Sequence, residues 1–428
     1  MIGNWVGSIC RSVQTMFLND FDLDLGFLRG TPLTFGEGAL TKTKRSLHKK
    51  TKNITITRSP RMKIAMIFGT RPEAIKMAPL YKKLKEENME VKVIATAQHR
   101  EMLDQVLNLF EIKPDYDLNI MTKNQTLPQL TSKLVTEIDK ILKIEPFDYI
   151  LVQGDTTSTF VGSLAAFYNK IFVGHVEAGL RTNDIYNPFP EEMNRRLTGT
   201  IAKHHFASTQ KAKDNLLKEG VEEKNIIVTG NTVIDALLWV KENKNKDIEK
   251  IKEKYNIKNK KFILVTMHRR ENWGKPIENV MKAIKRYLHE NEEMHIVFPV
   301  HLNPIVRESV YKILGNEEKA ILIDPVEYLE FIALMDESHY IMTDSGGIQE
   351  EAPTLGKPTL VLRETTERPE AIEAGTAKLV GTQEEKVYQA MKELETEKYA
   401  QMSKASNPFG DGKASQRIVE FLKKRYYS

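Results

Sequence analysis

Two carboxylates stand directly behind apolar, β-rich runs of the sequence. Asp155 is the third residue after the run 149–152, and Glu177 comes directly after the run 171–176. If both runs are strands of one parallel sheet, their carboxyl ends meet at the edge where such sheets bind ligands. Two carboxylates at one edge suit general acid and base catalysis. Asp155 has a second interpretation as a helix cap, because a predicted helix begins just after it; Glu177 is not a natural cap.

A third carboxylate, Glu191, opens a predicted helix after Pro188-Phe189-Pro190. It could join the other two as an acid or a base. Acidic residues are also common in the first turn of helices, where they face the positive end of the helix dipole. Both interpretations of Glu191 remain open from the sequence.

Two cations, Arg71 and Lys76, follow the first apolar run, 64–68. Gly69 marks a turn there, and Pro72 suits the first position of a helix. One interpretation is that the two cations bind an anion or a sugar. The other is that they are surface charges at the start of a helix, and the segment alone does not decide between them. It matches neither the phosphate loop of NTPases nor the dinucleotide fingerprint.

In the second half, the run 262–267 ends at His268, which is followed by Arg269 and Arg270. A histidine beside two arginines at a strand end can bind a pyrophosphate, although most single histidines are structural. His301 follows the run 295–300 and is a further candidate at the same edge.

A strand also turns into a helix through Ser345-Gly346-Gly347. Residues without bulky side chains let backbone N–H groups approach an anion at the positive end of a helix. Glu351, about one turn into that helix, could face a ribose, and Arg368 follows the next strand at the same edge. The alternative is a glycine-rich turn that binds no ligand.

The apolar runs alternate with helical patterns, which predicts βαβ units and parallel sheets. Residues 232–255 have a helical pattern and place a domain boundary near Gly230. We therefore predict an α/β protein with two doubly wound domains, 62–230 and 231–408, and a C-terminal segment, 409–428. The predicted strands are 64–68, 91–97, 149–152 and 171–176 in the first domain, and 262–267, 295–300, 321–323, 340–343 and 359–362 in the second.

Composition excludes several classes of protein. The 428 residues suffice for two domains, and no stretch approaches the roughly 18 apolar residues of a membrane span. A single cysteine, Cys10, excludes a disulfide framework within the chain and zinc sites built on thiolates. The histidines are dispersed and form no metal motif. We expect a soluble, cytoplasmic protein with neither metal nor membrane partner.

The net charge of +5 is unevenly distributed. Residues 1–61 contain ten Lys and Arg against four Asp and Glu, so the rest of the chain is close to neutral and has no broad surface for nucleic acid. We predict that residues 1–61 are a disordered basic extension outside the fold. This segment is either an extension upstream of a true start at Met62 or a basic arm for a membrane or nucleic acid.

Four segments in this order, residues 68–79, 153–157, 175–182 and 344–351, resemble the bacterial non-hydrolysing UDP-N-acetylglucosamine 2-epimerases. The resemblance runs from Met62 to the C-terminus. It implies a GT-B architecture, in which two Rossmann-like domains flank a cleft and a C-terminal helix, here 415–424, crosses back to the first domain. It also implies a homodimer, no redox cofactor and no metal.

By position, the resemblance implies Asp155, Glu177, Glu191 and His268 as catalytic residues. It implies UDP-sugar contacts from Arg71, Lys76, Asp155, Glu177, His268, Phe331, Ser345, Gly346, Gly347, Glu351 and Arg368. The family has a second, regulatory UDP-N-acetylglucosamine site, for which Gln98, Arg270 and His301 are the candidates.

The implied reaction is reversible conversion of UDP-N-acetylglucosamine to UDP-N-acetylmannosamine for cell-surface polysaccharide synthesis. Loss of UDP and of the proton on carbon 2 would give a 2-acetamidoglucal, and UDP would then add back with a proton on the opposite face, which requires at least two acid/base groups. A hydrolysing epimerase that releases UDP and N-acetylmannosamine, a GT-B glycosyltransferase and a catalytically silent UDP-sugar sensor are the alternatives.

Overall fold

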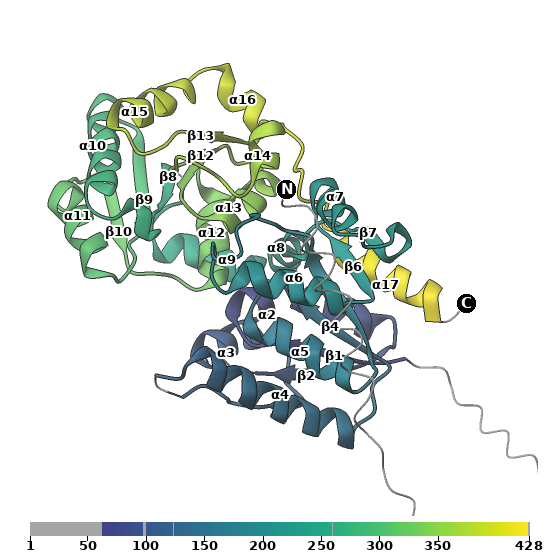
Figure 1. The fold of residues 1–428 in the computed structure, drawn as a ribbon. Helices are drawn as coiled ribbons and strands as arrows, with labels where there is room; N and C mark the ends of the chain where they lie inside the picture. Colours follow the sequence, from purple (N-terminus) through teal and green to yellow (C-terminus); the bar gives the residue numbers. More distant parts are fainter. Residues whose placement is uncertain (1–61, 97–99, 123, 259, 427–428) are drawn as a thin grey trace, which may run out of the picture. The chain divides into compact units, whose positions relative to one another are not determined.

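Two fully parallel sheets carry the described part of the chain (Figure 1). The computed structural model describes residues 62–96, 100–122, 124–258 and 260–426, which all belong to one unit of the chain. Sheet A has seven strands in the order β3-β2-β1-β4-β5-β6-β7, and sheet B has six in the order β10-β9-β8-β11-β12-β13. In each sheet the order reverses once, which confirms the predicted doubly wound α/β class.

The strands alternate with helices along the chain. Sheet A consists of β1 (Lys63–Phe68), β2 (Glu90–Ala95), β3 (Tyr116–Asp117), β4 (Tyr149–Gln153), β5 (Phe172–Ala178), β6 (His204–Ala207) and β7 (Ile226–Val228). Its helices are α2 (Arg71–Glu86), α3 (Arg100–Leu109), α4 (Leu127–Ile144), α5 (Thr157–Tyr168), α6 (Glu191–Ile201) and α7 (Gln210–Lys218).

Two consecutive helices, α8 (Thr232–Asn243) and α9 (Asn245–Lys254), lead to the second sheet. Sheet B consists of β8 (Lys261–Thr266), β9 (Met294–Pro299), β10 (Ala320–Ile323), β11 (Tyr340–Thr343), β12 (Thr359–Val361) and β13 (Ala377–Leu379). The remaining helices are α10 (Lys275–Glu290), α11 (Pro304–Leu314), α12 (Tyr328–Glu337), α13 (Gly346–Glu351), α14 (Pro369–Glu373), α15 (Glu384–Glu393), α16 (Glu397–Ser403) and α17 (Ala414–Tyr426).

All nine predicted strands are present, within one or two residues of their expected ends in the described part of the chain. The pattern missed β3, β6, β7 and β13, which have only two to four residues each. The helical pattern predicted over 232–255 forms two helices, because the backbone leaves the helical region at Lys244 (φ −119°). The prediction that residues 1–61 are disordered lies outside the described residues.

The last helix, α17, packs against α2 and α8. Its Phe421 ring meets the rings of His204 and Phe206 edge-on, at centroid distances of 4.9 and 5.7 Å. Asp235 on α8 accepts the backbone N–H groups of Ala414 and Ser415, which would otherwise lack a partner at the start of the helix. Among the described residues, no helix is long and apolar enough to cross a membrane.

Candidate functional site

The carboxyl ends of β1 and β4 lie side by side where the strand order of sheet A reverses. The turns that follow the two strands are joined by Glu73, a buried residue of α2. Its carboxylate accepts the N–H of Gly69 at 2.9 Å and the N–H of Thr70 at 2.7 Å after β1, and the hydroxyl of Thr156 at 2.5 Å after β4. In open α/β sheets this reversal point is where ligands bind.

Glu177 projects from an irregular part of β5. The register with β6 shifts between Val176 and Ala178, and Glu177 has φ +63°, a left-handed conformation that costs a non-glycine residue about 1–3 kcal/mol. Such bulges re-aim a side chain. The Glu177 carboxylate forms an ion pair with Lys76 and accepts a hydrogen bond from Nε2 of Gln153 at 2.9 Å.

Charges from both sheets surround this pair. Burial alone would raise the pKa of Glu177, but Lys76, Arg368 and Arg195 hold it below its ordinary value. Burial would likewise lower the pKa of Lys76, yet Glu177 and Glu350 raise it. Both groups therefore keep their charges inside the protein, as a buried ion pair requires.

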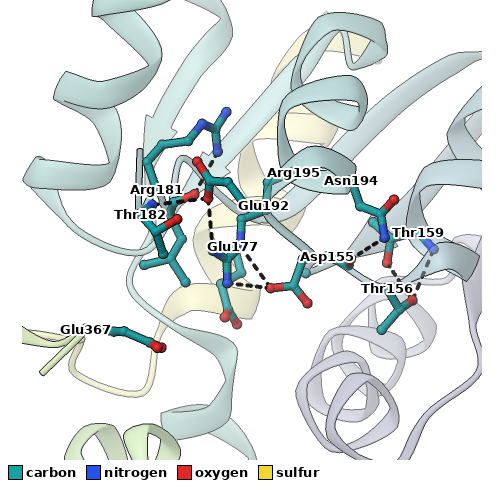
Figure 2. Close-up of polar contacts among 12 residues, drawn as sticks. Asp155, Thr156, Thr159, Glu177, Arg181, Thr182, Glu192, Asn194, Arg195 and Glu367 are labelled. Atoms are coloured by element: carbon teal, nitrogen blue, oxygen red, sulfur yellow. Dashed lines mark hydrogen bonds and ion pairs between the residues drawn. The ribbon is translucent and has the colours of Figure 1, made fainter. Parts of the chain in front are cut away.

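Asp155 does not cap the following helix. The N-cap of α5 is Thr156, whose hydroxyl accepts the N–H of Thr159, so the capping interpretation of Asp155 is wrong. The Asp155 carboxylate instead accepts Nε of Arg195 at 2.9 Å and lies 2.7 Å from its Nη2. Figure 2 shows Arg195 between Asp155 and Glu192.

The two acids at the start of α6 have different surroundings. Glu192 is buried and accepts the N–H of Thr182 at 3.1 Å and Nη1 of Arg195 at 3.1 Å. Glu191 is partly exposed in the first turn, and no hydrogen bond or ion pair joins its carboxylate to another described residue. Its carboxylate therefore pairs neither with Arg195, the partner of Asp155, nor with Lys76, the partner of Glu177.

Glu351 lies in a buried polar pocket within sheet B's half. It accepts the hydroxyl of Tyr328 at 2.8 Å, and burial raises the pKa of Glu351 to about 7, against the opposing effects of Tyr328, Lys76 and Arg71. Arg71 belongs to the first half, so its electrostatic contact with Glu351 spans the two halves. Phe331 lies one turn beyond Tyr328 on α12 and is partly buried.

Arg368 lies beside the glycine turn. Its Nε donates to the buried Glu350, and its guanidinium carbon would lie 3.8 Å from a Cβ added at Gly346. Burial would lower the pKa of Arg368, but Glu350 and Glu177 raise it. Ser345 precedes α13, and its N–H is held by the hydroxyl of Thr343 at 3.0 Å; Gly347 is the second residue of α13.

His268 and His301 come together after β8 and β9, with ring centroids 6.2 Å apart and an interplanar angle of 26°. Nδ1 of His268 lies 3.2 Å from the buried carboxylate of Asp344. Arg270 lies on the short turn after His268 and is exposed. The third regulatory candidate, Gln98, lies outside the described residues.

A cavity of about 740 Å³ opens beside these groups and is lined from both halves of the chain. Glu177 and Arg195 contribute from the first half, and Arg269, Glu350 and Arg368 from the second. Of the residues that the sequence analysis proposed for the site and that the structure describes, Glu177, Arg269 and Arg368 belong to its lining.

Several residues that organise the site were not predicted. They are Glu73, Gln153, Arg195, Tyr328, Asp344 and Glu350. Four of them had a signal in the sequence, because Glu73, Gln153, Asp344 and Glu350 lie within the segments 68–79, 153–157 and 344–351. The partners of Arg195 and Gln153 depend on pairings that only the fold reveals.

Two doubly wound parallel sheets, with one cavity lined from both halves of the chain, define a GT-B architecture of two Rossmann-like domains. The family model described as UDP-N-acetylglucosamine 2-epimerase matches residues 82–423. The chain belongs to this family.

Relatives match over nearly their whole length. The UDP-N-acetylglucosamine 2-epimerase of Bacillus subtilis (strain 168) is 55% identical over 371 residues, which cover 85% of this chain and 95% of the relative. The crystal structure of UDP-GlcNAc 2-epimerase from Neisseria meningitidis bound to UDP-GlcNAc is 50% identical with a TM-score of 0.78, covering 85% of this chain and 100% of that one. The S. aureus MnaA-UDP co-structure is 54% identical with a TM-score of 0.75, covering 85% and 96%.

Proposed function

We propose that this protein is a non-hydrolysing UDP-N-acetylglucosamine 2-epimerase, which interconverts UDP-N-acetylglucosamine and UDP-N-acetylmannosamine. The observation that carries the proposal is the pair of carboxylates, Asp155 and Glu177, at neighbouring strand ends of sheet A. Arg368 of sheet B's half contributes to the electrostatic field at Glu177. The family membership and the UDP-GlcNAc bound to the relative from Neisseria meningitidis support the substrate.

The carboxylates act on carbon 2 of the sugar. Asp155, Glu177 and Glu191 are the acid/base candidates. In the elimination step, one carboxylate takes the proton from carbon 2 while the bond from carbon 1 to the UDP oxygen breaks. A 2-acetamidoglucal and UDP result, and no external reactant is needed.

Re-addition reverses these changes. The UDP oxygen bonds again to carbon 1, and a carboxylic acid on the other side of the sugar delivers a proton to carbon 2. A cleft that excludes water favours this step over hydrolysis, because water would otherwise compete for the intermediate.

The diphosphate is held by cations and backbone donors. In this proposal His268, Lys76, Arg71 and Arg368 stabilise its charge. In the turn Ser345-Gly346-Gly347, the two glycines offer their backbone N–H groups, while the N–H of Ser345 stays bonded to Thr343. Glu351 binds the ribose and Phe331 lies near the uracil. The diphosphate would share Lys76 and Arg368 with Glu177. When it binds, the attraction of these two cations for the Glu177 carboxylate would weaken, and that carboxylate would become more basic.

The finer organisation is also proposed. Residues 62–230 and 231–408 form the two domains, and 409–428 the returning C-terminal helix. The protein is a cytoplasmic homodimer that supplies polysaccharide synthesis. A second UDP-N-acetylglucosamine beside His301, Arg270 and Gln98 would activate turnover.

The test is incubation of the purified protein with UDP-N-acetylglucosamine in deuterated water, followed by proton NMR of the sugar. UDP-N-acetylmannosamine with deuterium at carbon 2, and no steady release of UDP, is the expected result. Accumulation of UDP and free N-acetylmannosamine would instead identify a hydrolysing epimerase. An unchanged spectrum together with tight UDP binding would favour a glycosyltransferase or a UDP-sugar sensor.

A further inference from the structure

Asp344 is a fully buried carboxylate between β11 and the Ser345 turn. It accepts the backbone N–H groups of His268 at 3.0 Å and Arg269 at 2.9 Å, and the side-chain amide of Asn272 at 2.9 Å. These donors all come from the segment after β8, the neighbouring strand. Asp344 therefore joins the strand ends on both sides of the reversal point in sheet B.

One contact of Asp344 has no role in holding the backbone. Its Oδ1 lies 3.2 Å from Nδ1 of His268, whose side chain is otherwise 42% exposed. The two nitrogens of an imidazole lie on opposite sides of the ring. A carboxylate beside Nδ1 therefore keeps a proton there and leaves Nε2 facing away from it.

Asp344 is suited to this role because it stays ionised. Burial alone would raise the pKa of Asp344, but the contacts with His268, Arg269 and Asn272 lower it below its ordinary value. A neutral carboxyl could equally well donate to Nδ1, whereas a carboxylate can only accept. The negative charge of Asp344 beside Nδ1 therefore favours a proton on that nitrogen.

We propose that Asp344 is a positioning residue that keeps the proton of His268 on Nδ1 and presents Nε2 to the diphosphate of UDP. The part that concerns UDP rests on the proposed function, while the tautomer of His268 does not. The competing explanation is a purely structural Asp344, which would hold the strand ends and leave the ring of His268 free to adopt either tautomer.

The first experiment measures the ring itself. The full-length protein is labelled with ¹⁵N-histidine, and two-bond ¹H–¹⁵N spectra show which ring nitrogen carries the proton. The chain has ten histidines, so His268→Gln identifies the signals of His268 by their loss. We expect a protonated Nδ1 in the wild-type protein; an Nε2–H tautomer with a bare Nδ1 would overturn the proposal whether or not any variant folds.

The second experiment uses Asp344→Asn, which keeps an oxygen for the backbone donors but loses the charge. We expect the His268 tautomer to change, kcat to fall on the order of 100-fold, and the Kd for UDP to stay within about threefold. The control is Asp235→Asn, which removes another buried carboxylate that accepts backbone N–H groups. It should leave both the tautomer and kcat unchanged.

The outcomes separate the two proposals. Wild-type kcat and an unchanged tautomer in Asp344→Asn would overturn the positioning role, and so would lost UDP binding with an unchanged tautomer. If the protein has no epimerase activity, the proposed function fails, yet the spectra of the wild-type protein still test whether Asp344 sets the tautomer of His268.

Discussion

The reversal points of the two sheets have the same topology but different chemistry. At the carboxyl ends of sheet A, Asp155 and Glu177 each lie against an arginine or lysine. At the carboxyl ends of sheet B, the acid Asp344 is saturated by donors, and Gly346 has no side chain. In the proposed function the sheet A end, with its two carboxylates, transfers protons, and the sheet B end, with its glycine turn, holds the diphosphate.

The two ends also differ in backbone strain. Glu177 adopts φ +63°, a left-handed angle that glycine tolerates best. Gly346 is a glycine but does not adopt a left-handed angle. A glycine would relieve the backbone strain at such a position. A strained residue that is not glycine therefore suggests that its side chain is needed there. The strain in sheet A therefore indicates that the carboxylate of Glu177 is needed. In sheet B, Gly346 is unstrained, which indicates that the open space beside its backbone is needed instead.

The largest expected effect comes from removing the acids of sheet A. Asp155→Asn and Glu177→Gln should each lower kcat on the order of 1000-fold, because an amide cannot exchange a proton with carbon 2. UDP binding should persist in both variants. Single-turnover kinetics and calorimetric titration with UDP measure the two quantities separately.

The control for this experiment is at the other end of the same strand. Asp148 precedes β4 and accepts the N–H of Lys63 at 2.8 Å. Asp148→Asn should keep kcat within about twofold of the wild-type value. If the Asp155 and Glu177 variants lose UDP binding instead of kcat, the division of labour between the two sheets is wrong.

The pH dependence of stability tests the buried acid of sheet B's half. Because burial raises the pKa of Glu351 to about 7, the unfolded chain releases this proton at lower pH than the folded protein does. The stabilisation is complete below the unfolded pKa near 4.5 and is lost as the pH rises through about 7. Between about pH 5 and pH 8, Glu351 should therefore cost about 2 kcal/mol of unfolding free energy.

Glu351→Gln should remove this part of the pH dependence. The measurement is urea unfolding of the nucleotide-free protein at both pH values. Glu242→Gln, at an exposed position of α8, is the control and should behave like the wild-type protein. Equal pH dependence in all three proteins would mean that Glu351 is already ionised at pH 5.

Much of the fold could be predicted because the strands are buried on both faces and therefore form continuous apolar runs. β6 escaped this reasoning, since two of its four residues are histidines. Burial lowers the pKa of His204 to about 4 and that of His205 to about 3, so both are neutral and pack like apolar rings. A sequence does not show which histidines lose their charge in this way.

The site was predictable where residue type and strand end coincide, as at Asp155, Glu177 and Ser345. It was not predictable where two distant side chains pair. Arg195 reaches Asp155 across 40 residues of sequence, and Thr156, the next residue after Asp155, caps α5. Interpretations of a residue that depend on such pairings can be decided only once the fold is known.

The smallest expected effect distinguishes two glycines, one in each sheet. A Cβ at Gly174 in β5 would lie 2.5 Å from the Tyr149 hydroxyl and 2.9 Å from the Phe206 ring. Gly174→Ala should therefore lower the unfolding free energy by about 1–3 kcal/mol and leave the Kd for UDP within about twofold.

Gly346→Ala should do the opposite. Its Cβ would meet only the Arg368 guanidinium, at 3.8 Å, which is an ordinary contact. The methyl group would, however, take the space through which a phosphate approaches the backbone of α13, so the Kd for UDP should rise about tenfold at unchanged stability. Urea unfolding of both variants measures the stability, and calorimetric titration measures the Kd for UDP. If Gly346→Ala loses stability and keeps its affinity for UDP, the glycine of sheet B serves packing, and the contrast between the two sheet edges fails.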